Sequence, residues 1–376
     1  MFSYWEQQSF VHYDHIVVGA GIVGLSVALE LRKKFPQERI LVLERGLMST
    51  GASSRNAGFA CMGSLTELLA DLEYMSASEV LTLFEARKRG LYLLRQRLGD
   101  QQIDYRANGS YELLNPQNLH ALEQLERINT LLKPICQQDA FRVANEQISN
   151  FGFNADYTKA LVENTCEGEL DTGKMLRALS DLALAQNIEI KTGASLSHFE
   201  EHKNEVRLFI PDHFRNENWQ LRCRNIYICT NAFTQQLIPN APLKPGRGQV
   251  LITKPIEKLP FKGIFHFDDG YYYFRAIHQR VLLGGGRNLD FETETTTLLA
   301  LNDAIQDRLD QVLKNIILPH TDFEIEQRWS GIMAFGTTKS PIVQAFSARV
   351  YGAFRMGGMG VALGSEVAQQ IVALAE

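Results

Sequence analysis

The first part of the chain alternates apolar runs and turns in the order strand, helix, strand. One apolar run ends at Val18, a second apolar stretch covers residues 25–31, and a third run covers residues 40–43. Short continuous apolar runs are typical of strands that a parallel sheet buries on both faces. The pattern therefore predicts a β-α-β unit over residues 14–45, the starting unit of an α/β fold.

Further along, the pattern predicts helices and strands in alternation rather than two contiguous halves. Leucines at helical spacing predict helices within residues 65–98. Other helices are predicted at 116–132, 174–185 and 300–317, and strands within 103–114, 188–191, 206–210, 221–224, 225–231 and 243–290. The last segment, 351–375, reads as strand, glycine turn and helix. Pieces of an α/β domain therefore occur at the start, the middle and the end, with sheet-rich inserts between them.

A glycine-rich turn separates the first strand from the first helix, and an acid ends the second strand. Gly19, Gly21 and Gly24 match the pattern Gly-x-Gly-x-x-Gly, and Glu44 follows at the end of the next strand. Such glycines permit the tight turn, the approach of a diphosphate and close helix packing, while the acid accepts hydrogen bonds from ribose hydroxyls. The helix N-terminus attracts phosphates. The combination predicts a dinucleotide site; a glycine turn without a ligand is the alternative.

The composition narrows the class of protein. The 376 residues carry a net charge of −5 with both signs mixed along the chain, and 45% of them are hydrophobic. The sequence has no block of basic residues that would indicate nucleic-acid binding. Its length suits two domains. The five cysteines have no metal-ligand spacing, which predicts reduced thiols and no metal site. Since no signal peptide or membrane span is recognisable, we expect a soluble, cytoplasmic protein.

Short motifs spread over most of the chain carry a more specific signal. Beyond the first glycine turn they are Glu44-Arg45-Gly46, Gly51–Gly58, Asp171-Thr172-Gly173, Gly193-Ala194, Thr230–Phe233, Pro245–Gln249, Trp329-Ser330-Gly331 with Ser340-Pro341, and Met356–Val361. In this order and spacing the chain resembles the D-amino-acid oxidase superfamily of flavoproteins, which includes glycine oxidase and sarcosine oxidase. The resemblance implies an α/β fold in which an FAD-binding Rossmann-like domain (1–80, 145–242 and 328–376) is interleaved with a β-sheet-rich substrate domain (81–144 and 243–327).

The resemblance also assigns the FAD contacts. The diphosphate and adenosine would meet the first turn and the end of the second strand, the flavin would lie on the loop that follows, and the ring would meet the C-terminal turn. The expected contacts are Gly19, Gly21, Ile22, Val23, Gly24, Glu44, Arg45, Gly46, Ser53, Ser54, Arg55, Asn56, Ala57, Gly58, Phe59, Leu196, Thr230, Asn231, Met356, Gly357, Gly358, Met359, Gly360 and Val361. Backbone N–H groups at the C-terminal turn would stabilise the negative charge of reduced flavin.

Two departures from sarcosine oxidase-like relatives bear on the cofactor. Those relatives attach the flavin through a late cysteine, whereas the last cysteine here is Cys229, so we expect non-covalent FAD. They also carry a lysine over the flavin on the strand matched to residues 281–286, where this chain has Val281-Leu282-Leu283. We therefore expect the reduced flavin to react slowly with oxygen. The electron acceptor is left open and is either oxygen or another molecule.

A third departure bears on the substrate. Amino-acid oxidases of this group place an arginine two residues after the glycine matched to Gly331, and it grips the substrate carboxylate; here that position is Met333. A thioether cannot replace a forked ion pair. Other cations could serve instead: Arg355, Arg275 and Arg247. Each has a purely structural role as its alternative.

Aromatic side chains and one histidine complete the expected substrate pocket. Tyr271 and Tyr273 share one face of a strand and are expected to wall the pocket. His266 is a weaker candidate, and Met333, Met356 and Met359 could line an apolar pocket. Packing in the core is the alternative for all of them.

The most specific expectation is an FAD-dependent oxidoreductase that removes a hydride from a C–H next to an amine. The substrate would be a secondary amine or an unusual amino acid, and water would hydrolyse the imine product. The choice of an amine comes from the resemblance alone. The alternatives are a 2-hydroxy acid dehydrogenase and a non-catalytic flavoprotein subunit. A small molecule and an electron acceptor are the expected partners, and the oligomeric state is left open.

Overall fold

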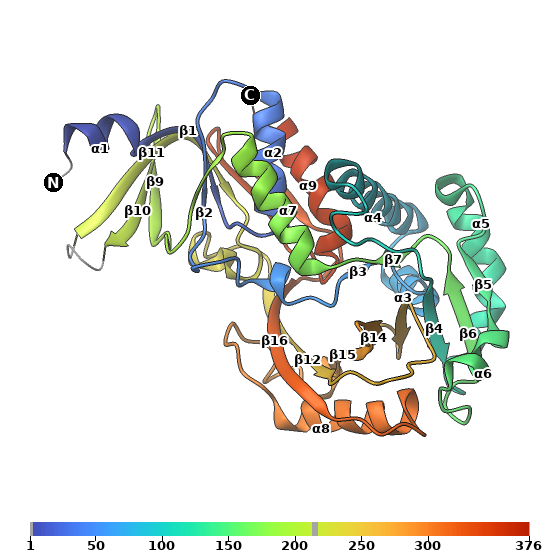
Figure 1. The fold of residues 1–376 in the computed structure, drawn as a ribbon. Helices are drawn as coiled ribbons and strands as arrows, with labels where there is room; N and C mark the ends of the chain where they lie inside the picture. The colour runs from blue at the N-terminus through green and yellow to red at the C-terminus, as the bar shows by residue number, and fades with distance from the viewer. Residues whose placement is uncertain (1–2, 213–216, 376) are drawn as a thin grey trace.

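Two large β-sheets with helices around them form the structure, a computed structural model that describes residues 3–212 and 217–375 (Figure 1). This arrangement confirms the expected α/β fold with an interleaved second sheet. The helices are α1 (Tyr4–Ser9), α2 (Ile22–Lys34), α3 (Leu65–Tyr74), α4 (Ala77–Leu98), α5 (Leu125–Cys136), α6 (Ile148–Phe151), α7 (Thr172–Ala185), α8 (Asp303–Val312) and α9 (Gly360–Ala373).

The first sheet is built on parallel strands that hold the glycine turn. Its order is β17-β18-β11-β1-β2-β8, with β10 and β9 extending it beside β11. The strands are β1 (His12–Val18), β2 (Ile40–Leu43), β8 (Glu189–Lys191), β9 (His198–Glu201), β10 (Val206–Asp212), β11 (Glu217–Ile228), β17 (Ile342–Ala345) and β18 (Val350–Phe354). Strands β2, β1, β11 and β18 run parallel, so their carboxyl ends meet at one edge of the sheet.

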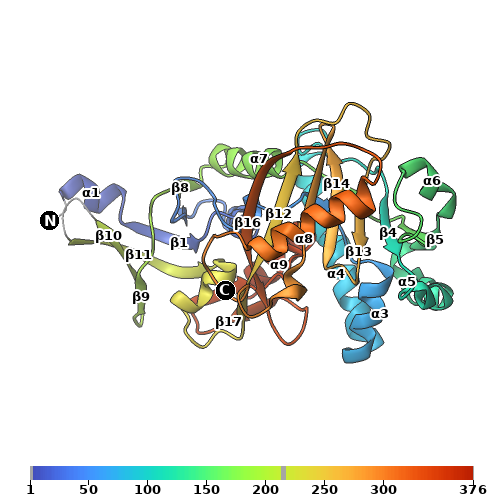
Figure 2. The ribbon, with the colours of Figure 1, turned by 90° about the horizontal axis from the view of Figure 1, so that it is seen from below.

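The second sheet carries the aromatic core. Its order is β16-β12-β15-β14-β13-β4-β6-β5. The strands are β4 (Ser110–Leu114), β5 (Phe141–Val143), β6 (Ala160–Asn164), β12 (Lys244–Thr253), β13 (Ile264–Phe267), β14 (Tyr272–Ile277), β15 (Arg280–Gly285) and β16 (Ile325–Phe335); β3 (Phe59–Ala60) and β7 (Gly168–Glu169) pair separately. Helix α8 covers one face of this sheet (Figure 2), where Ile305 and Leu309 pack with Phe265 and Phe274.

Helix α2 lies in the middle of the helical layer and is apolar almost all round. Its residues 22–29 are all buried, together with Leu31. A helix without a polar face must be covered on every side. Here the cover comes from the first sheet together with α7 and α9, which lie beside α2 in Figure 1.

Helices α2 and α9 come from opposite ends of the chain and approach closely at a glycine. A Cβ built on Gly364 of α9 would lie 2.6 Å from Cγ2 of Ile22, the first residue of α2. Any larger side chain would push the helices apart. The contact therefore brings the two N-termini to the same end of the helical layer.

Several elements differ from the sequence-based expectation. Residues 221–224 and 225–231 were expected as two strands, but β11 is one strand through residue 228, because it pairs with β10 on one side and β1 on the other. The expected helix 116–132 begins as a 3-10 turn (Leu119–Gln124) before α5, and the helix 300–317 narrows to α8 followed by a π turn, Leu313–Ile317. The pattern missed β16, β17, β5 and β6. The expected loop residues 213–216 lie outside the described residues.

The second sheet reaches past two of the expected domain boundaries. Strand β6 lies within the stretch 145–242 and most of β16 lies within 328–376, yet both pair inside the second sheet. The division into an FAD-binding and a substrate domain remains a proposal, and the sheets suggest moving these two segments to the substrate side.

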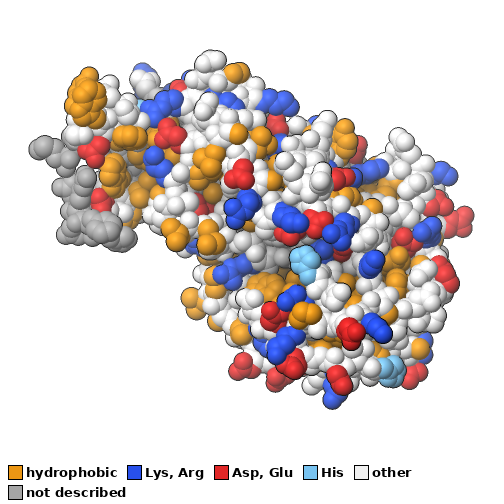
Figure 3. Space-filling view, in the orientation of Figure 1, with side chains coloured by type: hydrophobic (Ala, Val, Ile, Leu, Met, Phe, Trp, Pro, Cys, Tyr) orange, Lys and Arg blue, Asp and Glu red, His pale blue; other side chains and the backbone are white. Residues whose placement is uncertain are grey.

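The molecular surface carries both charge signs. Lys, Arg, Asp and Glu side chains are interspersed over the face shown in Figure 3. This mixture agrees with the mixed charge pattern along the sequence.

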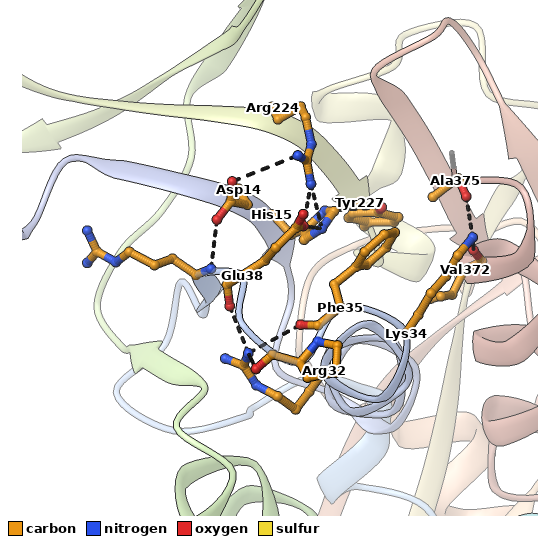
Figure 4. Close-up of polar contacts among 12 residues, drawn as sticks. Asp14, His15, Arg32, Lys34, Phe35, Glu38, Arg224, Tyr227, Val372 and Ala375 are labelled. Carbon is orange, nitrogen blue, oxygen red and sulfur yellow. Dashed lines mark hydrogen bonds and ion pairs between the residues drawn. The ribbon is translucent and has the colours of Figure 1, made fainter.

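A buried polar cluster ties the connection between α2 and β2 to the first sheet (Figure 4). The imidazole of His15 is fully buried, its Nε2 lies 2.6 Å from Glu38 Oε2, and its ring stacks on Phe35. Arg224 also pairs with Glu38 and lies 4.0 Å from Asp14. Burial lowers the pKa of His15 despite the neighbouring carboxylates. The cluster therefore holds a neutral imidazole beside an ionised Glu38, whose own pKa is lowered chiefly by Arg224.

We predict that His15 makes stability fall as the pH decreases below neutrality. Its pKa in the folded chain lies below the ordinary 6.5, so between pH 7.5 and 5.5 the unfolded chain binds more protons at this position than the folded chain does. The free energy of unfolding should therefore fall over this range because of His15. Glu38 loses its charge only at lower pH and does not contribute here.

Urea unfolding at the two pH values should show a smaller drop for His15→Gln than for the wild type. The control is His12→Gln, an exposed histidine on the same strand, which should leave the pH dependence unchanged. An identical drop in wild type and His15→Gln would contradict the account.

Candidate functional site

One large cavity of about 670 Å³ lies between the carboxyl edge of the first sheet and the second sheet. Segments distant in sequence line it: the glycine turn after β1, the loop 49–59, residues 194–196, the segment after β11, strands of the second sheet, and the turn before α9. The carboxyl edge of a parallel sheet is where ligands bind in open α/β folds. The cavity is therefore the candidate functional site.

Two glycines of the first turn are required by close backbone contacts. Gly19 has φ +106°, and a Cβ on it would lie 2.7 Å from the carbonyl oxygen of Cys229. A Cβ on Gly24 would lie 1.8 Å from the carbonyl oxygen of Gly19. The turn therefore has the geometry that brings the start of α2 against β1 and β11 and leaves the cavity open beside it.

The carboxylate of Glu44 is fixed at the end of β2. Although only 7% exposed, it faces the cavity and accepts hydrogen bonds from the backbone N–H groups of Ala20 (3.1 Å) and Gly46 (2.9 Å). Arg45 lies next to it with its guanidinium 3.6 Å from the ring centre of Phe233. An oriented acid and a flat stacked group suit the polar and aromatic parts of an adenosine.

Helices α2 and α9 both begin at the cavity without a side-chain cap. Their N-cap residues are Gly21 and Met359, and neither caps the first turn through its side chain. By contrast, α3, α4, α7 and α8 each have a Ser, Asp or Asn cap. A helix start leaves N–H groups that need acceptors, so these two ends present donors to the cavity.

Several of the first N–H groups of α2 and α9 have no acceptor in the part of the chain that the structure describes. The N–H of Ile22 donates to Ser53 Oγ (3.0 Å). Within the described ranges, the N–H groups of Val23, Gly360 and Val361 have no protein acceptor. An anion at either end would satisfy these donors and interact with the positive end of the helix dipole.

The loop 51–58 is fastened on both sides of the cavity. Asn56 Oδ1 accepts hydrogen bonds from the N–H of Gly58 (2.8 Å) and from Thr172 Oγ1 (2.9 Å). Arg55 donates to the carbonyl of Ser330 (3.0 Å), and the indole of Trp329 donates to the carbonyl of Arg55 (3.0 Å). The loop therefore connects the start of α7 with β16.

Most of the residues expected to contact the cofactor line this one cavity. Those that do are Gly19, Gly21, Ile22, Val23, Glu44, Arg45, Ser53, Arg55, Asn56, Ala57, Phe59, Leu196, Thr230, Asn231, Met356, Gly357, Gly358, Met359, Gly360 and Val361. Gly24, Gly46, Ser54 and Gly58 do not line it, and they lie in the adjoining backbone turns.

The three arginines proposed from the sequence as substrate anchors do not line the cavity. Arg275 is buried, donates to the carbonyls of Ala57, Gly58 and Leu170, and pairs with Glu169 (3.2 Å). It therefore holds the loop 51–58 against β7 from behind.

The other two arginines also have protein partners. Arg355 donates to the carbonyls of Ser340 and Pro242 (2.9 Å) and so fastens loops beside α9. Arg247 forms a forked ion pair with buried Glu294. None of the three reaches the cavity, because its guanidinium is used inside the protein.

The second sheet forms the wall opposite the turn before α9. Tyr271 and Tyr273 line the cavity, whereas Tyr272 packs in the core, stacked on Phe267. Met333 lines the cavity too. Burial raises the pKa of Tyr273 to about 12, so its phenol stays protonated at neutral pH. The wall is mostly aromatic and apolar.

Sequence reasoning missed five charged residues at the cavity: Glu67, Asp71, Asp269, Arg287 and Lys339. Asp71 and Lys339 form an ion pair (2.6 Å) that links α3 to the loop after β16. Arg287 follows β15 directly. The only signal for it is its place after the glycines that end an expected strand, and that signal says nothing of where the side chain points.

Behind the wall, carboxyl groups are buried beside His266. Glu167 accepts hydrogen bonds from Ser110 Oγ (2.6 Å) and the N–H of Gly63, and Glu112 accepts from Ser64 Oγ (2.9 Å). Burial raises the pKa of each glutamate to about 7. Burial also lowers the pKa of His266, whose Nε2 lies 3.9 Å from Glu167 and lines the cavity region.

The residues at the cavity fit FAD. The uncapped helix starts would provide donors for the diphosphate and for the flavin ring, and fixed Glu44 would provide acceptors for ribose hydroxyls. Residues 14–374 also match a family model described as FAD dependent oxidoreductase. The chain belongs to this family of FAD-dependent oxidoreductases.

Known proteins of similar sequence and structure are oxidoreductases as well. The oxidoreductase is 24% identical over 348 residues to the mitochondrial L-2-hydroxyglutarate dehydrogenase of Nematostella vectensis, covering 85% of this chain and 73% of that protein. Its fold matches glycine oxidase from Geobacillus kaustophilus (TM-score 0.78, 17% identity, 97% and 94% of the chains) and L-proline dehydrogenase from P. horikoshii (TM-score 0.77, 17%, 97% and 93%).

Within residues 3–212 and 217–375, no helix of the oxidoreductase is long and apolar enough to cross a membrane. The same ranges contain no cluster of His, Cys, Asp and Glu side chains suited to a metal ion.

We predict that Gly358 is required for tight FAD binding because its φ is +84°. A side chain in this region costs about 1–2 kcal/mol, so Gly358→Ala should weaken FAD binding by about 5- to 30-fold. FAD affinity is measured by titrating the apoprotein. Gly99→Ala is the matched control, since Gly99 also has a positive φ of +81°, its Cβ would meet nothing within 4 Å, and it does not line the cavity. Equal losses in both variants would contradict the prediction.

We predict that Arg275→Gln destabilises the oxidoreductase before any substrate is added. Glu169, 4% exposed, would lose its cation, and breaking a buried pair costs about 3–5 kcal/mol. Thermal unfolding and bound FAD should both decrease. The control is Arg106→Gln, since Arg106 is exposed and its partner Asp104 is only partly buried. Normal stability of Arg275→Gln with a raised KM would instead indicate a substrate contact.

Proposed function

We propose that this oxidoreductase removes a hydride from a carbon next to the nitrogen of a small amine and transfers it to FAD. The amine is a secondary amine or an unusual amino acid, and water hydrolyses the imine that results. The observation that carries the proposal is the single cavity shared by the two uncapped helix starts and the aromatic wall of the second sheet. Family membership supports the redox chemistry, and the structural similarity to glycine oxidase and L-proline dehydrogenase supports the amine.

FAD supplies the hydride acceptor at its N5 when it is bound. The residues of the chain would bind the cofactor, orient the substrate and keep water from the reacting carbon. The N–H groups of Gly360 and Val361 at the start of α9 would stabilise negative charge on the ring. Tyr273 and Phe59, whose rings lie 5.6 Å apart in an edge-to-face contact, would exclude water from the reacting carbon and leave the protonated phenol as a hydrogen-bond donor.

The same proposal covers non-covalent attachment and slow oxygen reactivity. The buried side chain of Leu282 packs with Ala57 of the loop 51–58 and with Val250, so an apolar group occupies the position expected of an oxygen-activating lysine. We propose an electron acceptor other than oxygen as the faster partner. The five free thiols are consistent with a cytoplasmic protein.

A 2-hydroxy acid is the second candidate substrate. The similarity to L-2-hydroxyglutarate dehydrogenase favours it. Both reactions remove a hydride from a carbon bearing a heteroatom, so the cavity serves either one. The two differ in whether the wall must accommodate an amine or a hydroxyl group.

We predict that amines, rather than hydroxy acids, bleach the flavin. Purified holoenzyme is mixed without oxygen with secondary amines, N-alkyl amino acids, primary amino acids and 2-hydroxy acids, and the flavin absorbance is followed. A secondary amine or an amino acid should reduce the flavin fastest, and reoxidation on admitting air should be slow.

Bleaching by 2-hydroxy acids alone would establish the second candidate. No bleaching by any compound would indicate a non-catalytic flavoprotein subunit. The same panel without enzyme, and with free FAD, is the control.

A further inference from the structure

Four cationic side chains line the cavity, and two of them have polar partners in the protein. Lys339 pairs with Asp71, and Arg55 donates to backbone carbonyls. Among the described residues the other two contact aromatic rings only: Arg45 stacks on Phe233 beside Glu44, at the expected adenosine end, and Arg287 lies at the wall of the second sheet. Arg287 is therefore the candidate on the substrate side. Within residues 3–212 and 217–375 its guanidinium has no hydrogen bond and no ion pair.

The guanidinium of Arg287 is held in place although it lacks an anion. Its carbon Cζ lies 3.9 Å from the ring centre of Phe335 and 4.9 Å from that of Phe291. Contacts to ring faces orient a guanidinium while leaving its N–H edge free. The residue is half-buried, and burial lowers its pKa. A desolvated cation without a partner is costly, so the site is prepared for an anion.

The side chain of Arg287 extends toward Met333, the position at which amino-acid oxidases of the family carry an arginine. In the sheet order, β12 lies between β15 and β16, and Met333 of β16 is paired with Gly246 of β12. A Cβ on Gly246 would lie only 2.7 Å from Arg287 Nη1. The guanidinium therefore crosses β12 over a residue without a side chain and ends beside Phe335, two residues from Met333.

This geometry brings a positive charge to the wall at the level of Met333, from a different strand. Gly246 leaves room for the guanidinium, Phe335 provides a ring on which it stacks, and the turn after β15 carries the arginine. Tyr271, whose phenol also lines the cavity, lies nearby and packs against Phe291 (6.1 Å). A forked donor with an adjacent hydroxyl group is suited to a carboxylate.

We propose that Arg287 binds the carboxylate of the substrate and compensates for the methionine at position 333. The substrate class is then an amine that also carries a carboxylate, an amino or imino acid, rather than a neutral amine. This inference rests on the proposed function for the amine part. The anchoring of a carboxylate by Arg287 stands independently of the reacting group.

The first test measures binding without turnover. Propionate and its neutral analogue propionamide are titrated into oxidised holoenzyme, and the shift of the flavin absorption spectrum is followed. Wild type should bind propionate more tightly. Arg287→Gln should weaken propionate binding by about 10- to 100-fold, as expected for a lost hydrogen bond to a charged group, and leave propionamide unchanged.

Matched variants separate anchoring from folding. Arg287→Lys keeps the charge without the fork and should fall between wild type and Arg287→Gln. Arg280 lies at the start of β15 and pairs with exposed Glu326. Arg280→Gln should therefore bind propionate as wild type does. Thermal unfolding and FAD content should match wild type in all three variants. If Arg287→Gln loses FAD, Arg287→Lys alone carries the comparison.

The second test compares the best amino-acid substrate of the bleaching panel with its primary amide. Arg287→Gln should lower the second-order rate constant of flavin reduction for the acid by 10- to 100-fold and leave that for the amide unchanged. Equal propionate binding by wild type and Arg287→Gln, or no propionate binding by wild type, would overturn the inference.

Failure of the proposed function gives a different pattern. If no amine bleaches the flavin while propionate binding still depends on Arg287, the anchoring role holds and the amine assignment falls. If amines bleach the flavin and Arg287→Gln treats acid and amide as wild type does, the function holds and the anchoring role falls.

Discussion

The contact between the start of α2 and the body of α9 is the constraint on which the site depends. Ile22 fits against α9 only because Gly364 has no side chain. This contact places two uncapped helix starts, from opposite ends of the chain, at one cavity. One helix start then offers N–H groups where a diphosphate is expected and the other where a redox-active ring is expected. The second sheet needs only to close the open side.

Local signals made the cofactor side of this arrangement predictable. The turn Gly19–Gly24, the acid Glu44 and the final glycine turn each depend on a few neighbouring residues, so their chemistry is readable in sequence. The family resemblance then implied that they act together. Strand boundaries were less accessible: β11 is one strand because it has partners on both sides, and no local pattern reveals the partners. Likewise β16 mixes polar and apolar residues and was missed.

The substrate side was not predictable, because charge alone does not say where a side chain is used. Arg275, Arg355 and Arg247 were reasonable candidates by position, yet each guanidinium is bound by carbonyls or by a carboxylate within the protein. Arg287 was overlooked, although among the described residues it is the cavity cation at the second-sheet wall whose guanidinium has aromatic contacts only. Its path across Gly246 follows from the register of three strands, which no single segment encodes. The charge balance of the folded wall, rather than the sequence position, distinguishes a structural arginine from one available to a ligand.

The central claim is that one FAD molecule contacts the starts of both α2 and α9. The most direct measurement is a crystal structure of the purified protein with its bound flavin. The account predicts one FAD per chain, with the diphosphate at the start of α2 and the flavin ring between the start of α9 and the wall of Tyr273 and Met333. Flavin density elsewhere, or a ring that does not contact the turn Gly357–Val361, would contradict it.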